Sequence, residues 1–232
     1  MTYFPVNVYL NHSIISLFSN REEVFNLNTI KKWIYRAVAA FLLLSLCLLS
    51  VFAIREHQRV YSLRENLILQ TVIDLHTISD SCHQAATAAD PTTHLNGSML
   101  DAVLRLNDRL DGLAHHGVAY DSTTLWGSDT FIHGLTVHPG LELLTKNLPL
   151  ISIQCSERTI TVSQLNSWLK ELEIAANSAL EQLIDLNASD LSSPTPGDWD
   201  IHVRSAAFDD GYSQAIRNFL DTPILRMTPQ DF

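Results

Sequence analysis

The apolar positions of this chain are concentrated in one unbroken run, Ala37 to Ile54, which reads AVAAFLLLSLCLLSVFAI. The run carries no charge, and Trp33, Ile34 and Tyr35 extend it on the N-terminal side. A helix rises about 1.5 Å per residue, so about 20 residues cross a hydrocarbon core about 30 Å thick. We therefore predict a transmembrane helix over residues 33–54, which includes Ala37, Phe41, Leu44, Leu48 and Ile54.

Two other interpretations of this run are a signal peptide and a buried core helix. The run begins more than thirty residues into the chain and is longer than the apolar part of a usual signal peptide. A core helix that is apolar on every side needs a larger body around it than this chain supplies. Both interpretations are disfavoured, and residues 1–32 are expected to form a short cytoplasmic tail.

Beyond the run, apolar residues recur at helical spacing. No Gly or Pro interrupts the sequence as far as Ile78, and one face is apolar through Val60, Leu63, Leu67, Val72 and Leu75. The pattern predicts a helical stalk over residues 55–90.

Further helices are predicted over residues 91–187, which we expect to form a helical domain on the far side of the membrane. Ser98 with Asp101 is a weak capping pattern for a helix that ends near His115. Thr161 with Gln164 is a stronger one, and it opens an apolar-striped helix that runs to about Leu186.

Proline and glycine positions divide the remaining sequence. Pro139 suits the first turn of a helix that Pro149 is expected to bend or end. Residues 188–232 begin with a linker rich in Ser, Pro, Gly and Asp, and include one short helix from about Tyr212 to Leu220. The predicted fold class is mainly α: a single transmembrane helix followed by a helical extracytoplasmic domain.

The distribution of charge along the chain predicts its orientation in the membrane. Residues 1–54 carry four basic and two acidic side chains, whereas residues 55–232 carry 11 basic and 23 acidic ones. Lys31, Lys32 and Arg36 precede the run, and Arg55 and Arg59 follow it. This bias favours an inner-membrane protein with a cytoplasmic N-terminus and a periplasmic C-terminal domain. The net charge of −10 argues against nucleic acid as a partner.

Candidate chemistry is sparse. His115, His116 and His133 with nearby aspartates have no metal-ligand spacing, so we predict no metal. No nucleophile motif such as G-x-S-x-G occurs, so we expect neither enzyme activity nor a cofactor. Cys82 and Cys155 both fall on the oxidising side, where they either form a disulfide or remain two free thiols.

The stripe that contains Leu165, Trp168 and Leu172 has two interpretations. It is either a face that binds a partner or part of the core of the domain. The spacing of the three residues fits both.

The order of elements around the apolar run resembles a known family. The segments that carry the resemblance are REEVF, KKWIYR, the run itself, REHQRVYSLREN, MLDAVLRLNDRLDGL and LELLTKNLPLI. Over roughly residues 15 to 155 this order is similar to the region of the last transmembrane helix in the IcmF/TssM family, inner-membrane components of type VI and related secretion systems. The family's phosphate-binding motif, G-x-x-x-x-G-K-[ST], is absent, so the chain looks like a truncated or diverged fragment and no functional residue is carried over.

The expected function is a non-enzymatic, membrane-anchored assembly subunit of an envelope-spanning, type VI-like secretion complex. Its expected partners are the lipid bilayer, other membrane or envelope proteins, and possible further copies of itself. The alternative is a sensory or receptor-type ectodomain that acts through a partner.

Overall fold

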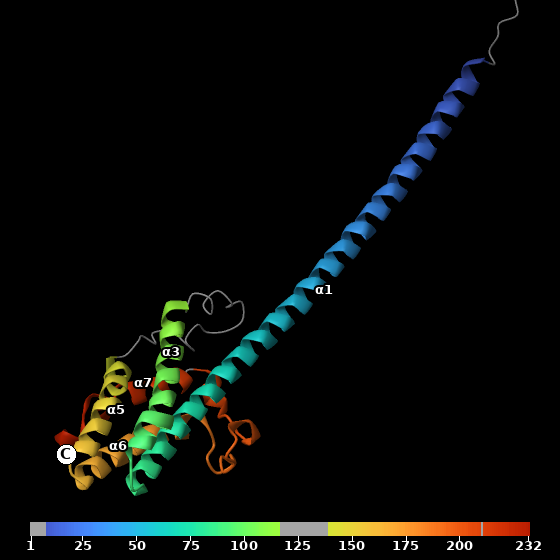
Figure 1. Ribbon diagram of the computed structural model, residues 1–232. Helices are drawn as coiled ribbons and strands as arrows, with labels where there is room; N and C mark the ends of the chain where they lie inside the picture. The colour runs from blue at the N-terminus through green and yellow to red at the C-terminus, as the bar shows by residue number, and fades with distance from the viewer. Residues whose placement is uncertain (1–7, 117–138, 210) are drawn as a thin grey trace, which may run out of the picture. The chain divides into compact units, whose positions relative to one another are not determined.

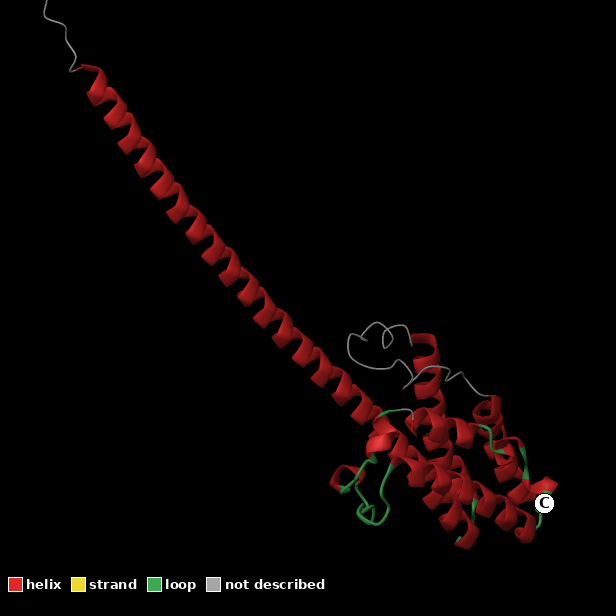
Figure 2. Cartoon of the chain, turned by 180° about the vertical axis from the view of Figure 1, so that it is seen from behind, coloured by secondary structure: helices red, strands yellow, loops and turns green. Residues whose placement is uncertain are grey.

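The computed structural model describes the backbone of residues 8–116, 139–209 and 211–232, and the side chains of residues 29–110, 139–209 and 211–232. The described backbone is mainly helical and contains no strand (Figure 2). It includes two isolated antiparallel bridges, Ile184 with Val203 and Asp190 with Asp200. The predicted mainly α fold class is confirmed at this level.

The chain divides into two compact units, Met1–Glu56 and His57–Phe232. Helix α1, Val8–Thr87, contributes residues to both (Figure 1). In the first unit it is the only described element. From residue 29 onward it contains an 18-residue window with a mean hydropathy of 2.7, none of which is buried. By length and composition, α1 is therefore able to cross a membrane.

The second unit is a helical domain with one core. It contains the end of α1 and the following elements: α2 (Thr92–His94), the π-helical turn η1 (Leu95–Met99), α3 (Leu100–His116), α5 (Pro139–Glu157), α6 (Val162–Leu183), η3 (Pro196–Asp198), η4 (Ser205–Phe208), α7 (Gly211–Leu220), η5 (Pro223–Arg226) and η6 (Pro229–Asp231). All the helices longer than one turn contribute to one cluster of buried apolar side chains. Its largest member is Trp168.

Residues 55–90 differ from the predicted stalk. Ile68, Val72, Leu75 and Ile78 in this part of α1 are fully buried. The second half of the segment is thus a core helix of the domain rather than a free-standing stalk. The apolar face that the sequence showed is the face that the other helices cover.

The start of α6 confirms the predicted capping box. Thr161 Oγ1 accepts a hydrogen bond from the Gln164 backbone N–H at 3.2 Å, and Gln164 Oε1 accepts one from the Thr161 N–H at 3.0 Å. These bonds satisfy two backbone donors that the first turn of a helix leaves open. The helix ends at Leu183, slightly before the predicted Leu186.

One prediction about a helix start is wrong, and one of the two outcomes expected at Pro149 is excluded. Ser98 does not cap α3: it lies inside η1, and its hydroxyl pairs with that of Ser81 at 2.6 Å. Pro149 does not end α5, which continues to Glu157. Leu148 and Ile151 on either side of the proline are buried, and this packing maintains a helix that local propensity disfavours.

Residues 188–232 are part of the domain. The predicted short helix is present as α7, and its Tyr212, Ile216 and Phe219 lie in the core. The last residues of the chain pack against α5 and α6, and Ile224 and Leu225 are buried there. Trp168 Nε1 donates a hydrogen bond to the Met227 carbonyl at 3.1 Å, so the C-terminal segment covers the stripe of α6.

Candidate functional site: an exposed apolar band and a buried polar anchor on α1

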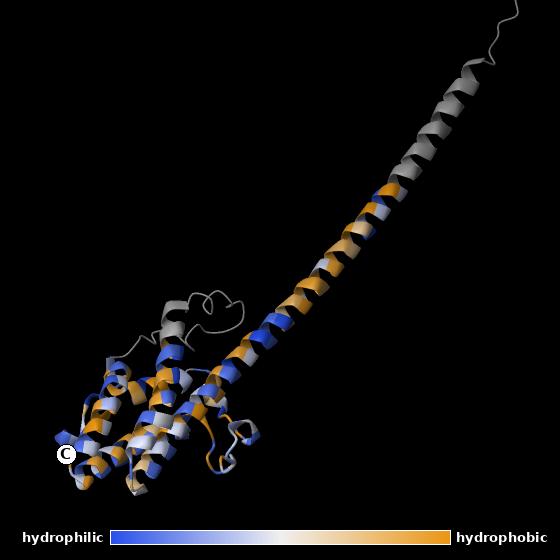
Figure 3. Ribbon diagram, viewed as in Figure 1, coloured by the Kyte–Doolittle hydropathy of each residue, from blue (hydrophilic) through white to orange (hydrophobic). Residues whose placement is uncertain are grey.

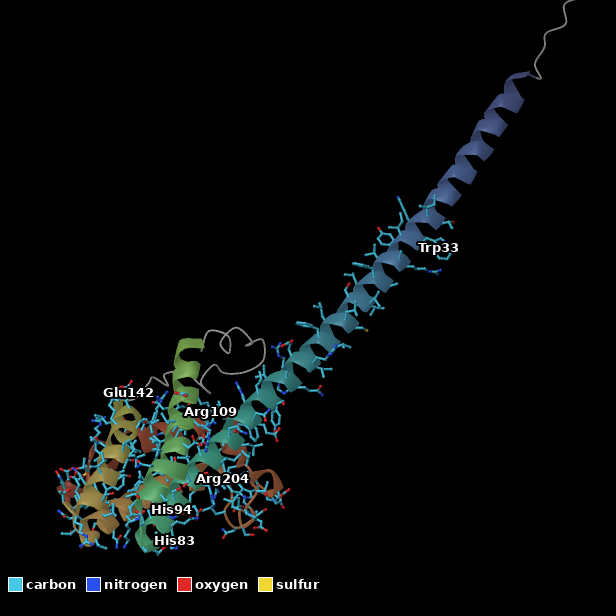
Figure 4. The ribbon with its side chains drawn as sticks, in the orientation of Figure 1. Trp33, His83, His94, Arg109, Glu142 and Arg204 are labelled. Atoms are coloured by element: carbon cyan, nitrogen blue, oxygen red, sulfur yellow. The ribbon has the colours of Figure 1, made fainter. Side chains whose placement is uncertain are left out.

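The first part of the candidate site is the apolar band of α1, which we define as residues 33–54. Its large apolar side chains are between 50% and 73% exposed. Figure 3 shows the band as mostly orange along the helix, and Figure 4 labels Trp33 near its start. The five residues named as transmembrane from the sequence lie in it and are exposed: Ala37, Phe41, Leu44, Leu48 and Ile54.

Apart from Arg36 in its first turn, the polar groups within the band are few and small. Ser50 Oγ donates a hydrogen bond to the Leu46 carbonyl at 2.8 Å, one turn earlier in the same helix. The hydroxyl is therefore satisfied without water. Cys47 is an exposed free thiol. Such a surface suits contact with hydrocarbon.

The second part of the site is the polar anchor, a buried ionic group made by Asp74, Arg105 and Arg109. Asp74 lies on the core face of α1, and its side chain is 1% exposed. Its Oδ1 accepts a hydrogen bond from Arg105 Nε at 2.9 Å, and its Oδ2 accepts one from Arg109 Nη1 at 2.7 Å. Both arginines come from α3, four residues apart on one face. Arg105 also contacts Asp101 at 2.5 Å.

Two hydroxyls extend the group toward α7. Tyr212 is fully buried, and its phenol pairs with Thr71 Oγ1 at 3.1 Å. Burial raises the pKa of Tyr212 to about 12, so the phenol remains protonated at neutral pH. The Thr71 hydroxyl donates to the Leu67 carbonyl at 2.8 Å. Residues from α1, α3 and α7 thus meet in one satisfied polar cluster.

The chemistry of this cluster is structural. Both carboxylate oxygens of Asp74 are engaged by guanidinium groups, and an arginine does not give up its proton in a protein. A buried charge paired in this way fixes orientation, because any other rotation of α1 would leave it without partners. The polar anchor therefore sets the rotation of α1 within the domain.

The sequence did not single out this cluster. Asp74 sits between Val72 and Leu75 on an apolar face, and a carboxylate in such a position is a recognisable departure from the pattern. Arg105 and Arg109 lie one helical turn apart. The sequence pattern did not indicate that α1 packs against α3, because that contact is part of the tertiary structure.

The two predicted disulfide partners are free thiols. Cys82 is fully buried, and burial with a contribution from Glu173 raises its pKa. Cys155 is half-buried, and burial with a contribution from Asp90 raises its pKa. The two thiols therefore have different electrostatic surroundings, and both favour the protonated form. Of the two alternatives, the structure shows the unpaired one.

The predicted partner face is buried. Leu165, Trp168 and Leu172 are 5%, 0% and 0% exposed, so the core interpretation of this stripe is the one that the structure shows. Residues from the C-terminal segment cover it, including Met227 through the hydrogen bond to Trp168. The sequence left this open because the covering residues lie some sixty positions away along the chain.

The histidines considered for metal fall outside the described side chains. His115 and His116 end α3, and His133 lies in a stretch whose backbone is also outside the described residues. Among the side chains that are described, no group of three His, Cys, Asp or Glu residues could hold a metal ion.

Comparison of the chain with known proteins returned no match to a family model, to a curated protein or to a solved structure.

Proposed function

We propose that this protein is a single-pass membrane anchor and assembly subunit of an envelope-spanning complex, with no catalytic role of its own. The observation that carries the proposal is the contrast between the apolar band and the helical domain. The domain has a core of its own, while the band exposes fourteen large apolar side chains. Transferring one such side chain out of water contributes about 1.5–3 kcal/mol, so a bilayer favours the band by tens of kcal/mol.

The charges that flank the band support a cytoplasmic N-terminus and a periplasmic domain. Three basic residues lie at its N-terminal end, Lys31 and Lys32 before the band and Arg36 in its first turn, and the sequence beyond Arg59 is predominantly acidic. Basic residues are retained on the cytoplasmic side of a span. The band and its flanks therefore support an inner-membrane protein whose larger, acidic domain lies in the periplasm.

An assembly role is supported by the resemblance to the IcmF/TssM family and by the nature of the polar anchor. The polar anchor holds α1 in one rotation in the domain, because both carboxylate oxygens of Asp74 accept hydrogen bonds from arginines of α3. A secretion complex of the type VI kind needs inner-membrane subunits that hold other envelope proteins in place. The bilayer, envelope proteins and further copies of the chain are the proposed partners.

Extraction and topology experiments test the proposed membrane anchoring and orientation. The full chain is expected to stay in the pellet after alkaline carbonate extraction, because hydrocarbon contact with the band is insensitive to pH. A periplasm-active reporter is expected to function at the C-terminus and not at the N-terminus. Release of the intact chain into the supernatant, or the opposite reporter pattern, contradicts the proposal.

Purification in mild detergent tests the assembly role. Envelope proteins or additional copies of the chain are expected to co-purify in fixed proportion. A monodisperse lone monomer, obtained under conditions that preserve known envelope complexes, contradicts it.

One observation favours the alternative, a receptor-type ectodomain that acts through a partner. The helix that supplies the apolar band also supplies core residues of the domain, including Ile68 and Val72. A ligand that altered the core would therefore act directly on the helix that enters the membrane. Co-purification of a kinase or another cytoplasmic output protein, in place of envelope proteins, would support this alternative.

A further inference from the structure

The outer face of α5 is apolar, although α5 already packs into the core on its other side. The apolar side chains on the core side are buried: Leu141, Leu144, Leu148 and Ile151. On the opposite side of the helix, Leu143, Leu150 and Ile153 are 39%, 56% and 53% exposed. A helix at the surface of a domain normally carries polar residues on this side. The second apolar face of α5 is therefore a departure from the usual pattern of a surface helix.

The residues of this outer face have the spacing of a helix–helix seam. We define the α5 seam as five exposed residues at alternating intervals of three and four: Leu143, Lys146, Leu150, Ile153 and Glu157. This alternation is the repeat along which two helices interlock their side chains in a coiled coil. The seam is thus built to receive another helix lengthwise.

Two charged residues lie on either side of the apolar centre of the seam. Lys146 Nζ is 3.8 Å from Glu142 Oε2 of the same helix, and the Lys146 side chain is 70% exposed. Figure 4 labels Glu142 near the start of α5, which Figure 1 shows at one side of the domain. Glu157 is exposed and has no ion-pair partner among the described side chains. Leu150 and Ile153 therefore lie between a positive and a negative group.

These charges match a second copy of the same helix in the antiparallel direction. In a parallel pair, Lys146 would meet Lys146 and Glu157 would meet Glu157. In an antiparallel pair with a two-fold axis between residues 151 and 152, Lys146 lies opposite Glu157 of the other copy. Leu150 then lies opposite Ile153, and the axis repeats both contacts.

The charges also select one register of the antiparallel pair. A shift of the two copies by one heptad would place Lys146 opposite Leu150 of the other copy. A charge buried against an apolar side chain loses its water without gaining a partner, which is costly. The register that pairs Lys146 with Glu157 avoids this cost and keeps the apolar residues together.

We propose that the α5 seam is the interface between two copies of this chain, packed antiparallel in this register. The contact uses the same surface on both copies, so it closes as a dimer. The inference deepens the proposed assembly role, on which it rests, by naming the surface through which copies of the chain meet. Copies anchored in one membrane have a raised effective concentration, which favours an interface as small as one pair of helices.

Exchange of the two charges tests the register in the full chain. Chains with two different epitope tags are co-expressed and solubilised in mild detergent, and capture through one tag is measured by recovery of the other. Lys146→Glu alone places two acids opposite each other at both contacts, and Glu157→Lys alone places two lysines there. Each single variant is expected to reduce recovery several-fold.

The two variants together are expected to restore what each alone removes. In a mixed pair of one Lys146→Glu chain and one Glu157→Lys chain, opposite charges meet at both contacts, so recovery is expected to return close to that of the parent chain. Recovery from the mixture that is no greater than from either variant alone overturns the proposed interface.

Matched substitutions on α6 control for the apolar and charged changes. Ile153→Asp is expected to reduce recovery several-fold, whereas Ile174→Asp is expected to leave it unchanged, although the two isoleucines are 53% and 51% exposed. Lys170→Glu, also exposed on α6, is the control for Lys146→Glu. Circular dichroism checks that every variant retains its helices. Equal losses from the α5 and α6 variants overturn the interface.

The same preparations separate this inference from the proposed function. A parent chain that captures no second copy overturns the α5 interface. If envelope proteins still co-purify with that chain, the assembly role stands. A lone monomer overturns both proposals together.

Discussion

Asp74 joins α1 to α3 through a buried ionic group. Its two oxygens hold Arg105 and Arg109, and its side chain is 1% exposed. Replacing Asp74 by Asn retains the shape but removes the carboxylate partner of Arg109 and leaves Arg105 with only the exposed Asp101 as a countercharge. We expect a loss of about 3 kcal/mol in the free energy of unfolding, measured by urea titration of the full chain in mild detergent.

A matched control for this change is Asp101→Asn. Asp101 also pairs with Arg105, but its side chain is 70% exposed. Exposed ion pairs contribute about 0–1 kcal/mol, so the control is expected to remain close to the parent chain. Equal losses in the two variants would show that Asp74 is not a buried anchor.

Arg158 stands in a backbone conformation that favours glycine. Its φ is 58°, and it directly follows the end of α5. The Thr159 N–H bonds back to the Gln154 carbonyl at 3.0 Å, as in a Schellman motif. We expect Arg158→Gly to raise the free energy of unfolding by about 1 kcal/mol, because it removes the clash of Cβ in the left-handed region.

Arg158→Ala is the control for the arginine side chain itself. It removes the guanidinium group but retains Cβ, so it is expected to give no comparable gain in urea titration. A gain of the same size for alanine and glycine would assign the effect to charge instead of backbone conformation.

His76 makes the stability of the domain depend on pH. Its ring meets that of Trp199 edge-on, with centroids 4.7 Å apart. Burial lowers the pKa of His76 from 6.5, and the charge of Asp80 only partly opposes this. The unfolded chain therefore takes up the proton at a higher pH than the folded chain does. The contribution of this residue is fully present above pH 6.5 and is lost as the pH falls below it.

The measurement compares the melting temperature of the full chain between pH 8 and pH 5 with that of His76→Phe, which retains a ring beside Trp199. The parent chain is expected to lose more stability than the variant on acidification. Parallel curves would contradict the prediction, since the other histidines are common to both chains.

At the scale of the element, α1 combines two surfaces in one helix: a band exposed on all sides and a stretch buried on one face. A single charge in the middle of the band tests the first of these. Leu44→Arg is expected to add about 2.5–3.5 kcal/mol to the free energy of membrane insertion and to lower the carbonate-resistant fraction.

Val162→Arg is the matched control for Leu44→Arg. Val162 is an apolar residue of the helical domain that is 75% exposed, and its replacement is expected to leave membrane extraction unchanged. Full carbonate resistance of the Leu44 variant would argue that the band is not held in hydrocarbon.

Most elements were predicted from local sequence. The uncharged run, the capping box of Thr161 and Gln164, and Pro139 at the first position of α5 each depend on residues close together in the chain. Local pattern failed where packing outweighed it. Pro149 lies inside a helix held by buried neighbours, and Ser98 bonds to Ser81 on α1 instead of capping α3.

At the scale of the whole molecule, the C-terminal segment closes the core. Ile224 and Leu225 are 3% and 0% exposed, and the Met227 carbonyl accepts the hydrogen bond of Trp168. Ending the chain at Asp221 removes both side chains and this acceptor. We expect a loss of at least about 4 kcal/mol in the free energy of unfolding, measured by urea titration in mild detergent.

Removal of Phe232 alone serves as the control for the truncation. Its side chain is 44% exposed, and the η6 capping box between Thr228 and Asp231 remains without it. This shorter deletion is expected to leave stability nearly unchanged. An intact cooperative transition for the chain that ends at Asp221 would contradict a closing role for the segment.

The sequence by itself determined the helical class, the apolar band and the main helix start, because hydrophobic spacing and capping are properties of neighbouring residues. Only the tertiary structure decided what each apolar face meets. It buried the α6 stripe under the C-terminal segment, placed Asp74 between two arginines of α3 and left the cysteines unpaired. These outcomes depend on contacts between residues far apart in the chain, which spacing along one helix does not encode.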